Sequence, residues 1–224
     1  MKTVCYFAIS KPSMARNSVL LKGLERNGIT VLECIDDSPS WRKLMGLIRK
    51  HRELKDAYDF MLVGYLSNMV VPLARLISKK KVVYNALCSM YEGAVLDRMK
   101  HGVLSPRRYL IWLIDFLAFH SAHLILVESE SQKRFLHRTF SVPLSKVKVT
   151  FTGADDEVFY PDASVQEEEE FTVLFRGWFI PATGVEYVLE AAKLLKGEPI
   201  HFRILGRGPL QKRVEELITL YGLE

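Results

Sequence analysis

The sequence predicts an α/β protein: a Rossmann-like parallel-sheet domain followed by the first half of a second Rossmann-like domain. Short β-rich runs alternate with helical runs along most of the chain, as in βαβ units. A polar, acidic stretch without periodicity interrupts this alternation near residues 162–170. The β-α-β pattern then starts again and ends in a glycine-rich turn, where open parallel sheets bind ligands.

The composition is that of an ordinary globular protein, with 49% hydrophobic and 25% charged residues in a chain of 224. Three cysteines (Cys5, Cys34 and Cys88) lack metal-ligand spacing and are expected to be free thiols in a reducing compartment. No apolar run is long enough to predict a membrane span. The net charge of +5 permits anionic partners such as nucleotide phosphates, nucleic acid or anionic lipid, without choosing among them.

The first β-α-β unit consists of a strand at Thr3–Ile9, a helix near Ser18–Asn27 and a strand at Ile29–Cys34. The loop after the first strand lies at the carboxyl end of a parallel sheet, which is the usual ligand-binding edge. Arg16 and Asn17 are therefore candidates for contacting substrate. Helix capping and solvation explain these two residues equally well.

A basic amphipathic helix is predicted for Ser40–Lys55, with Trp41, Leu44, Met45 and Ile48 on one face. Such a helix is able to lie on an anionic membrane surface. The alternative is a surface helix that packs Trp41 and Leu44 on the sheet and leaves its lysines and arginines in water.

The middle of the domain is predicted to hold a strand at Phe60–Val63, a helix at Asn68–Ile77 and a strand at Val82–Leu87. The polar and aromatic loop that follows offers side chains for a polar acceptor, although it could also pair its own charges. These candidates are Tyr91, Glu92, Asp97 and Arg98.

A further helix is predicted after Ser105-Pro106, with Ser105 as N-cap, and it runs to about Ala122. Because it is apolar nearly all round, it is either buried or seated in a membrane interface, with burial the commoner case. Two histidines at its end, His120 and His123, are more typical of structural residues than of a metal site.

The first domain ends with a strand at Leu124–Val127, a helix capped by Ser129–Ser131 and a strand at Val147–Phe151. In the following TGADDEVFYP, the Phe159-x-Pro161 end is expected to anchor the exit from the domain. The predicted boundaries are a first domain at 1–161, an acidic linker at 162–170 and a partial domain at 171–224.

The last β-α-β unit has a strand at Phe171–Gly177, a loop at Trp178–Gly184, a helix and a strand at His201–Leu205. The turn at Gly206–Pro209 follows. Strand, glycine loop and helix N-terminus together are typical of a phosphate-binding arrangement.

Several segments now show a resemblance to a known family. VTFTGADDEVFYP, VLFRGWFIPATGVEYVLEAAKLL and FRILGRGPLQKRVEEL resemble the central region of family 4 glycosyltransferases, which have the GT-B fold. SMYEGAVLDR and LILVESESQKRFL resemble the acceptor-domain part of one branch. The resemblance covers essentially the whole chain and implies a C-terminally truncated member, because the family's donor domain continues with an acidic pair beyond Glu224.

The resemblance implies an acceptor-binding first domain and a second domain that binds a nucleotide diphospho-sugar. It implies retention of anomeric configuration, no metal and no cofactor. Trp178 and Thr183 stand where most members have Arg and Lys on the diphosphate, so either Arg176 or Arg207 supplies the positive charge or the donor is bound differently. A general base is not identified. The expected donor-side residues are Arg176, Gly177, Thr183, Gly184, Gly206, Arg207 and Gly208, and the acceptor-side residues are Arg16, Asn17, Tyr91, Glu92 and Arg98.

The leading hypothesis is a cytoplasmic glycosyltransferase of cell-envelope polysaccharide biosynthesis, acting on a lipid-linked or polysaccharide precursor, with peripheral attachment to the inner face of the membrane as an option. The alternative is a non-catalytic or split-enzyme subunit that docks on a membrane and needs a second chain to complete the donor site. An NAD-dependent dehydrogenase is disfavoured because no G-x-G-x-x-G follows the first strand. No nucleic-acid partner is expected.

Overall fold

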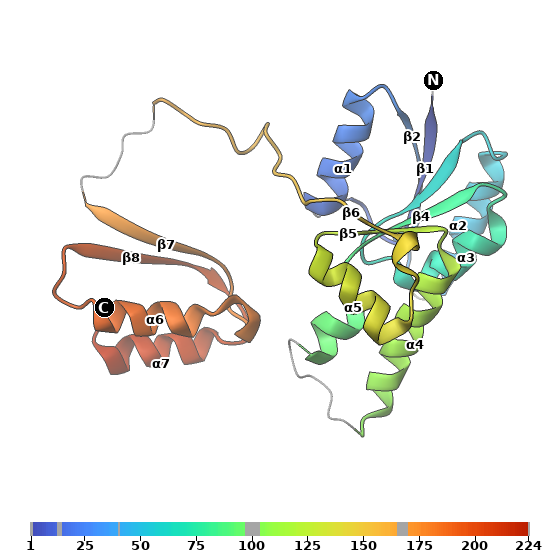
Figure 1. Ribbon diagram of the computed structural model, residues 1–224. Coiled ribbons are helices and arrows are strands. Elements are labelled where there is room, and N and C mark those ends of the chain that lie inside the picture. The colour runs from blue at the N-terminus through green and yellow to red at the C-terminus, as the bar shows by residue number, and fades with distance from the viewer. Residues whose placement is uncertain (1, 13–14, 40, 97–103, 165–169, 224) are drawn as a thin grey trace. The chain divides into compact units, whose positions relative to one another are not determined.

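The computed structural model describes residues 2–12, 15–39, 41–96, 104–164 and 170–223. The chain divides into two compact units, which meet in the sequence between Tyr160 and Pro161 (Figure 1). Each unit is described by itself below.

The first unit contains a six-stranded sheet with the order β2-β1-β3-β4-β5-β6 (Figure 1). Every neighbouring pair is parallel, as the βαβ pattern predicts. The strand order reverses beside β1, which is the switch point where such sheets bind ligands. The strands are β1 (Thr3–Ala8), β2 (Thr30–Ile35), β3 (Phe60–Val63), β4 (Lys81–Leu87), β5 (Leu124–Val127) and β6 (Val147–Val149).

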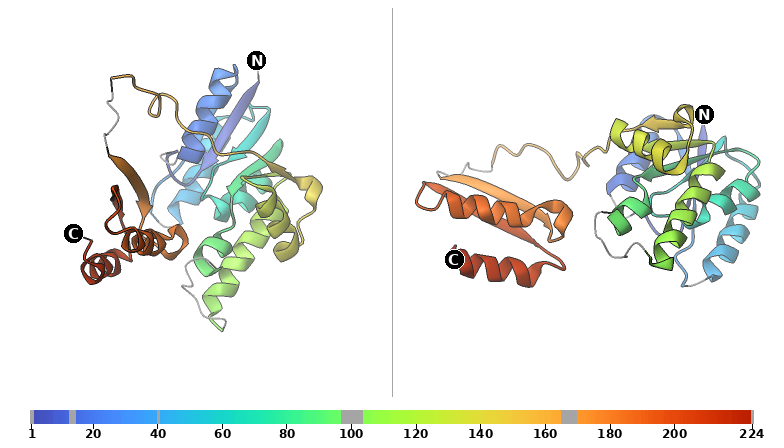
Figure 2. Two further views of the ribbon diagram at one scale, coloured as in Figure 1. Left: turned by 60° about the vertical axis from the view of Figure 1, so that its left-hand side comes forward. Right: turned by 60° about the horizontal axis from the view of Figure 1, so that its bottom comes forward.

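Helices cover both faces of this sheet (Figure 2). On one face, Val4, Tyr6 and Ala8 of β1 pack with Leu21 of helix α1 (Ala15–Arg26). On the other face, Cys5 and Phe7 belong to a larger core that four helices and a 3₁₀ turn share. These are α2 (Arg42–Glu53), η1 (Asn68–Val70), α3 (Val71–Ile77), α4 (Pro106–Ser121) and α5 (Glu130–Phe140). Cys5 and Cys34 are buried free thiols, as expected from their strand positions.

Helix α2 turns a different face to the core from the one expected. Its buried residues are Leu47 and His51, whereas Trp41 is 67% exposed and Met45 is 59% exposed. The expectation that Trp41 and Leu44 pack on the sheet was wrong. The close approach of helix and sheet is at Gly46, where an added Cβ would clash with the Asp36 carboxylate just after β2.

Helix α4 is half buried, so the burial expected from its apolar sequence holds for one face of the helix. Asp115, Ala118 and Phe119 face the core. Its outer face exposes Tyr109, Leu110, Leu113 and Leu117. Ser105 is the N-cap residue, as expected, but its side chain makes no capping hydrogen bond. None of the helices that the structure describes is long and apolar enough to cross a membrane.

Helix α5 begins as its serines predicted. The Ser129 hydroxyl accepts a hydrogen bond from the Gln132 N–H at 3.2 Å, which confirms the cap. Two short turns flank this part of the unit, η2 (Glu92–Leu96) after β4 and η3 (Leu144–Lys146) before β6.

The second unit is a two-stranded parallel sheet with two helices on one face (Figure 1). Its elements are β7 (Phe171–Trp178), η4 (Pro181–Thr183), α6 (Val185–Leu194), β8 (Ile200–Arg207) and α7 (Gln211–Tyr221). Phe175 of β7 and Ile204 of β8 are paired in register and pack against the helices. Strand alternation therefore places Leu174 and Leu205 on the opposite face, where both are exposed.

Candidate functional site

The loops at the carboxyl ends of β7 and β8 are joined to each other through Phe179. Gly177 and Gly206 are partners in the strand register. An added Cβ on Gly206 would clash with the carbonyl oxygen of Gly177 and with the Phe179 ring. Gly208 has φ of +158°, and a Cβ there would lie 2.7 Å from the Phe179 carbonyl oxygen. Both glycines are therefore required by the packing of this unit, before any ligand is considered.

Thr183 and Gly184 form the entry to helix α6. The Thr183 hydroxyl donates to the carbonyl oxygens of Trp178 at 2.7 Å and Ile180 at 2.8 Å, so it closes the loop on itself. Gly184 adopts the left-handed conformation at φ of +69° and caps the helix without a side chain. No side chain therefore caps the first-turn N–H groups of α6, an arrangement open to an anion.

A cavity of about 510 Å³ lies at the carboxyl ends of the two strands. It is lined by Arg176, Gly177, Trp178, Leu205, Gly206 and Arg207. Arg176 pairs with Leu205 and Trp178 with Arg207, so alternation places both arginines on the face without helices. The structure thus brings four expected donor-side residues together. It does not bring Thr183, Gly184 or Gly208 into the same cavity.

Arg16 and Asn17 lie at the carboxyl edge of the large sheet, as predicted, but both are buried in polar contacts within the fold. The Arg16 Nε donates to Asn85 Oδ1 at 2.9 Å, and Nη1 donates to the Thr150 carbonyl at 2.6 Å and to Thr152 Oγ1 at 3.0 Å. Arg16 Nη2 has no hydrogen-bond partner among the described residues. Burial lowers the pKa of Arg16, and the charge of Glu128 partly opposes this shift.

Asn17 links the loop after β3 to strand β4. Its Oδ1 accepts hydrogen bonds from the Tyr65 N–H at 2.8 Å and from Asn85 Nδ2 at 3.2 Å, while its Nδ2 donates to the Tyr65 carbonyl at 3.3 Å. Its amide is thus occupied by the loop after β3 and by a side chain of β4. This is a structural role for a residue that sequence reasoning treated as a substrate contact.

Tyr91 and Glu92 are held in place by neighbouring helices. The Tyr91 N–H donates to Asp115 Oδ2 at 2.8 Å, and Arg108 lies over the Tyr91 ring, 5.5 Å from its centroid. Glu92 Oε2 accepts a hydrogen bond from Gln132 Nε2 at 2.7 Å. The other two candidates of this loop, Asp97 and Arg98, lie outside the described residues.

Asp115 is a residue that the sequence reasoning missed. It is fully buried, and it accepts hydrogen bonds from Asn68 Nδ2 at 2.8 Å and from the Tyr91 N–H. Burial raises its pKa to about 6, although these hydrogen bonds oppose the shift. A single acid in the middle of an otherwise apolar helix was the available signal.

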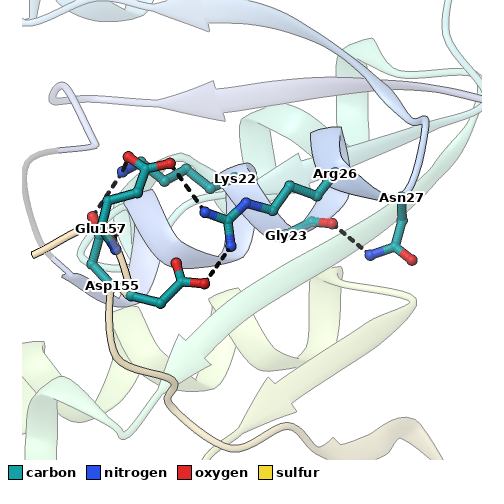
Figure 3. Close-up of polar contacts among 7 residues, drawn as sticks. Lys22, Gly23, Arg26, Asn27, Asp155 and Glu157 are labelled. Atoms are coloured by element: carbon teal, nitrogen blue, oxygen red, sulfur yellow. Dashed lines mark hydrogen bonds and ion pairs between the residues drawn. The ribbon is translucent and has the colours of Figure 1, made fainter. Parts of the chain in front are cut away.

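Four ion pairs fasten the strap, which we define as residues 150–160, to helix α1 (Figure 3). Lys22 lies 2.8 Å from Asp155 and 2.7 Å from Glu157, and Arg26 lies 2.8 Å from Asp156 and 3.0 Å from Glu157. These partners lower the pKa of all three acids. Phe159 is 60% exposed, so the expectation that it anchors the domain exit was wrong. The anchor is ionic.

The two histidines beside α4 have structural partners. A ring nitrogen of His120 lies 2.9 Å from the Phe140 carbonyl, and His123 Nδ1 accepts a hydrogen bond from the Val82 N–H at 2.9 Å. Within the described ranges, no three His, Cys, Asp or Glu side chains are grouped so as to hold a metal ion.

Comparison with solved structures defines the class of this fold. The chain resembles HepE of Anabaena, solved with UDP, at a TM-score of 0.63 and 17% identity over 100% of this chain and 67% of HepE. It also resembles the lipopolysaccharide outer core galactosyltransferase WaaB, at a TM-score of 0.60 and 11% identity over 100% of this chain and 66% of WaaB. S. aureus TarM matches 80% of this chain and 35% of its own, with a TM-score of 0.53 and 12% identity.

These neighbours are GT-B glycosyltransferases, and the chain has the GT-B type of α/β fold, with an N-terminal Rossmann-like sheet and part of a second such unit. It spans about two thirds of the length of HepE and WaaB. No protein-family model matches the sequence, and no curated protein matches it. At 11–18% identity the likeness to HepE and WaaB establishes the fold alone.

Proposed function

We propose that this chain is the acceptor domain and part of the donor domain of a glycosyltransferase that uses a nucleotide diphospho-sugar. One observation carries the proposal: two arginines and two backbone glycines converge on a cavity at the carboxyl ends of β7 and β8. HepE, which has the same fold, was solved with UDP and with UDP and glucose, and TarM with UDP and sugar ligands. A diphosphate needs positive charge and close backbone approach, and this cavity offers both.

In this proposal Arg176 and Arg207 bind the diphosphate in place of the cations that Trp178 and Thr183 cannot supply. The backbone amide groups of Gly177 and Gly206 add fixed dipoles at the same cavity. The chain's contribution to transfer is electrostatic: it holds the departing diphosphate while the acceptor hydroxyl is positioned. We further propose membership of glycosyltransferase family 4, transfer with retention and without a metal, and a lipid-linked or polysaccharide acceptor on the cytoplasmic side.

Calorimetry with UDP tests the donor site. We expect Arg176→Gln and Arg207→Gln each to weaken UDP binding by about tenfold or more, because each removes a charge-assisted hydrogen bond. Lys212→Gln on α7 is the matched control, since Lys212 is a solvent-exposed cation of the same unit outside the cavity. Equal affinity in all three variants would contradict the arginine assignment, and no UDP binding in the parent chain would contradict a self-sufficient donor site.

The outward face of α2 favours a second function, docking on an anionic membrane. Trp41 and Met45 are exposed beside a surface cavity of about 670 Å³ whose lining includes Arg42, Arg49 and Arg52. Exposed aromatic and apolar side chains flanked by arginines are typical of interfacial helices. With this docking role we propose the alternative of a subunit whose donor site is completed by another chain.

Flotation with vesicles of anionic phospholipid tests this docking. Replacing Arg42, Lys43, Arg49 and Arg52 with serine should abolish flotation. Replacing four exposed basic residues elsewhere on the chain with serine should leave flotation unchanged. Lys50 stays unchanged because its ammonium donates to the Ile35 carbonyl at the end of β2. Flotation that survives the four changes, or a parent chain that never floats, would refute membrane docking by α2.

A further inference from the structure

A groove beside helix α1, which we call the α1 groove, has a volume of about 350 Å³. It lies between α1 and the first residues of the strap. Its apolar lining comes from Val19, Leu20 and Leu24 on one side and from Phe151, which is 83% exposed, on the other. The ion pairs of the strap hold this second wall against the helix (Figure 3).

Arg16 lies at one end of this groove. Its two Nη1 partners, Thr150 and Thr152, also line the groove, so the guanidinium group is at the groove wall. The side chain is 94% buried, since only 6% is exposed, and its Nη2 has no hydrogen-bond partner in the described part of the chain. A buried guanidinium that leaves donors unused is costly, because a protein normally pairs every buried charge and donor.

The direction of the groove gives the shape of its ligand. The lining residues contributed by α1 and the position after it run from Arg16 to Asn27. At the α-helical rise per residue, the groove therefore extends about 16 Å along the helix. Arg16 is also the second residue of α1, so the positive end of the helix dipole lies at the same end of the groove. The groove therefore has a cationic end and an elongated apolar body.

We propose that the α1 groove binds a phosphate monoester that carries an apolar chain. The phosphate lies at the Arg16 end of the groove, where the guanidinium charge attracts it, and the chain lies on Val19, Leu20 and Leu24. Taking this amphiphile to be the sugar acceptor rests on the proposed transferase function, but binding itself does not. A phosphate complements the positive charge at this end, and burial of the chain against the apolar lining adds to the affinity.

Gly23 provides a sharp variant for the test. It lines the groove, and a Cβ added to it would meet no atom within 4 Å. Gly23→Leu is therefore expected to fold, because the new side chain enters open space and a helical glycine is replaced by a better helix former. It fills the apolar body of the groove and leaves the Arg16 contacts intact.

The experiment is calorimetry with octyl phosphate below its micellar concentration, compared with inorganic phosphate and with octanol. We expect octyl phosphate to bind at least about tenfold more tightly than either, and Arg16→Gln and Gly23→Leu each to weaken it by about tenfold or more. Lys212→Gln should leave its affinity unchanged. If Arg16→Gln fails to fold, Gly23→Leu alone decides.

Equal binding of octyl phosphate and inorganic phosphate would overturn the apolar half of the proposal. Binding that neither variant changes, or no binding at all, would overturn the whole of it. Titration of UDP into the same samples separates the two proposals: octyl phosphate that binds to a chain unable to bind UDP would leave the groove assignment standing and remove the transferase.

Discussion

Asp115 shows how one buried side chain shapes the predicted acceptor loop. Its carboxylate holds Asn68 before α3 and the Tyr91 N–H after β4, and no cation contacts it within the described part of the chain. The folded-state pKa of about 6 is above the ordinary value of 3.8. An acid of this kind stabilises the fold fully below the ordinary pKa, and the contribution is lost as the pH rises through the folded pKa.

Asp115→Asn should therefore change the pH dependence of stability. As the pH rises from about 4 to about 7, the unfolding free energy of the parent should fall by about 2 kcal/mol relative to the variant. Urea denaturation at several pH values in this range measures the difference. Parallel curves for the two proteins would mean that Asp115 keeps an ordinary pKa in the folded chain.

Two glycines should respond in opposite ways to the same added methyl group. Gly206→Ala forces a Cβ into the Gly177 carbonyl and the Phe179 ring, so we expect a loss of about 2 kcal/mol or more. Gly23→Ala adds a methyl group to open space within α1 and should stabilise by about 0.5–1 kcal/mol. Thermal unfolding of both variants checks the signs. A neutral Gly206→Ala would contradict the packing role of this glycine.

Among the elements, the strap is held to α1 by charge rather than by apolar packing. Single exposed ion pairs contribute little, but here two cations share three acids in one network. The backbone of the strap forms a turn in which the N–H groups of Val158 and Phe159 donate to the Asp155 carbonyl. Freeing the strap would expose these amides without opening the sheet.

Lys22→Gln combined with Arg26→Gln should accelerate amide exchange at Val158 and Phe159 several-fold and leave global stability almost unchanged. The Thr150 N–H, which donates to the Val127 carbonyl in the sheet, is the internal control. Added salt at about 1 M should mimic the double variant, since it screens exposed charges. If amide exchange instead accelerates equally at Val158, Phe159 and Thr150, the double variant promotes general unfolding and does not free the strap alone.

Strands were more predictable than the orientation of helices. Runs such as Phe60–Val63 are buried on both faces of a parallel sheet, so their apolar composition alone indicates them. Helix α2 has apolar residues on more than one side, and the side that it buries, with Leu47 and His51, is set by tertiary packing that periodicity does not report. The anchoring of the strap was not predictable either, because Lys22 and Asp155 are 133 residues apart.

At the scale of the whole molecule, the second unit has an uncovered sheet face. Leu174, Trp178 and Leu205 are exposed there, at 57%, 63% and 49%, and no helix covers this face among the described residues. Apolar surface of this kind promotes association.

Replacing Leu174 and Leu205 with lysine should therefore lower the self-association of the chain, as measured by sedimentation velocity. Lysine at Leu194, which is 84% exposed on α6, is the matched control and should have a smaller effect. If the parent chain remains monomeric at every concentration, self-association through this sheet face is refuted.

The candidate site could be predicted only in part. Position along the chain placed Arg176, Gly177, Gly206 and Arg207 at strand ends, and register brings them into one cavity. What Arg16 and Asn17 contact was beyond sequence reasoning, because their partners come from strand β4 and from the loops after β3 and β6. Single-sequence patterns identify the edge of a sheet but not the long-range hydrogen bonds across it.

A side chain at Gly206 or Gly208 would clash with Phe179. This clash affects how the evolution of proteins with this fold is interpreted. A descendant that loses its ligand would still be selected to keep both glycines, because the chain could not fold around Phe179 without them. A glycine-rich turn of this type is thus evidence of shared ancestry and of a preserved scaffold. Inherited activity would have to be traced through Arg176 and Arg207, which packing leaves free to drift.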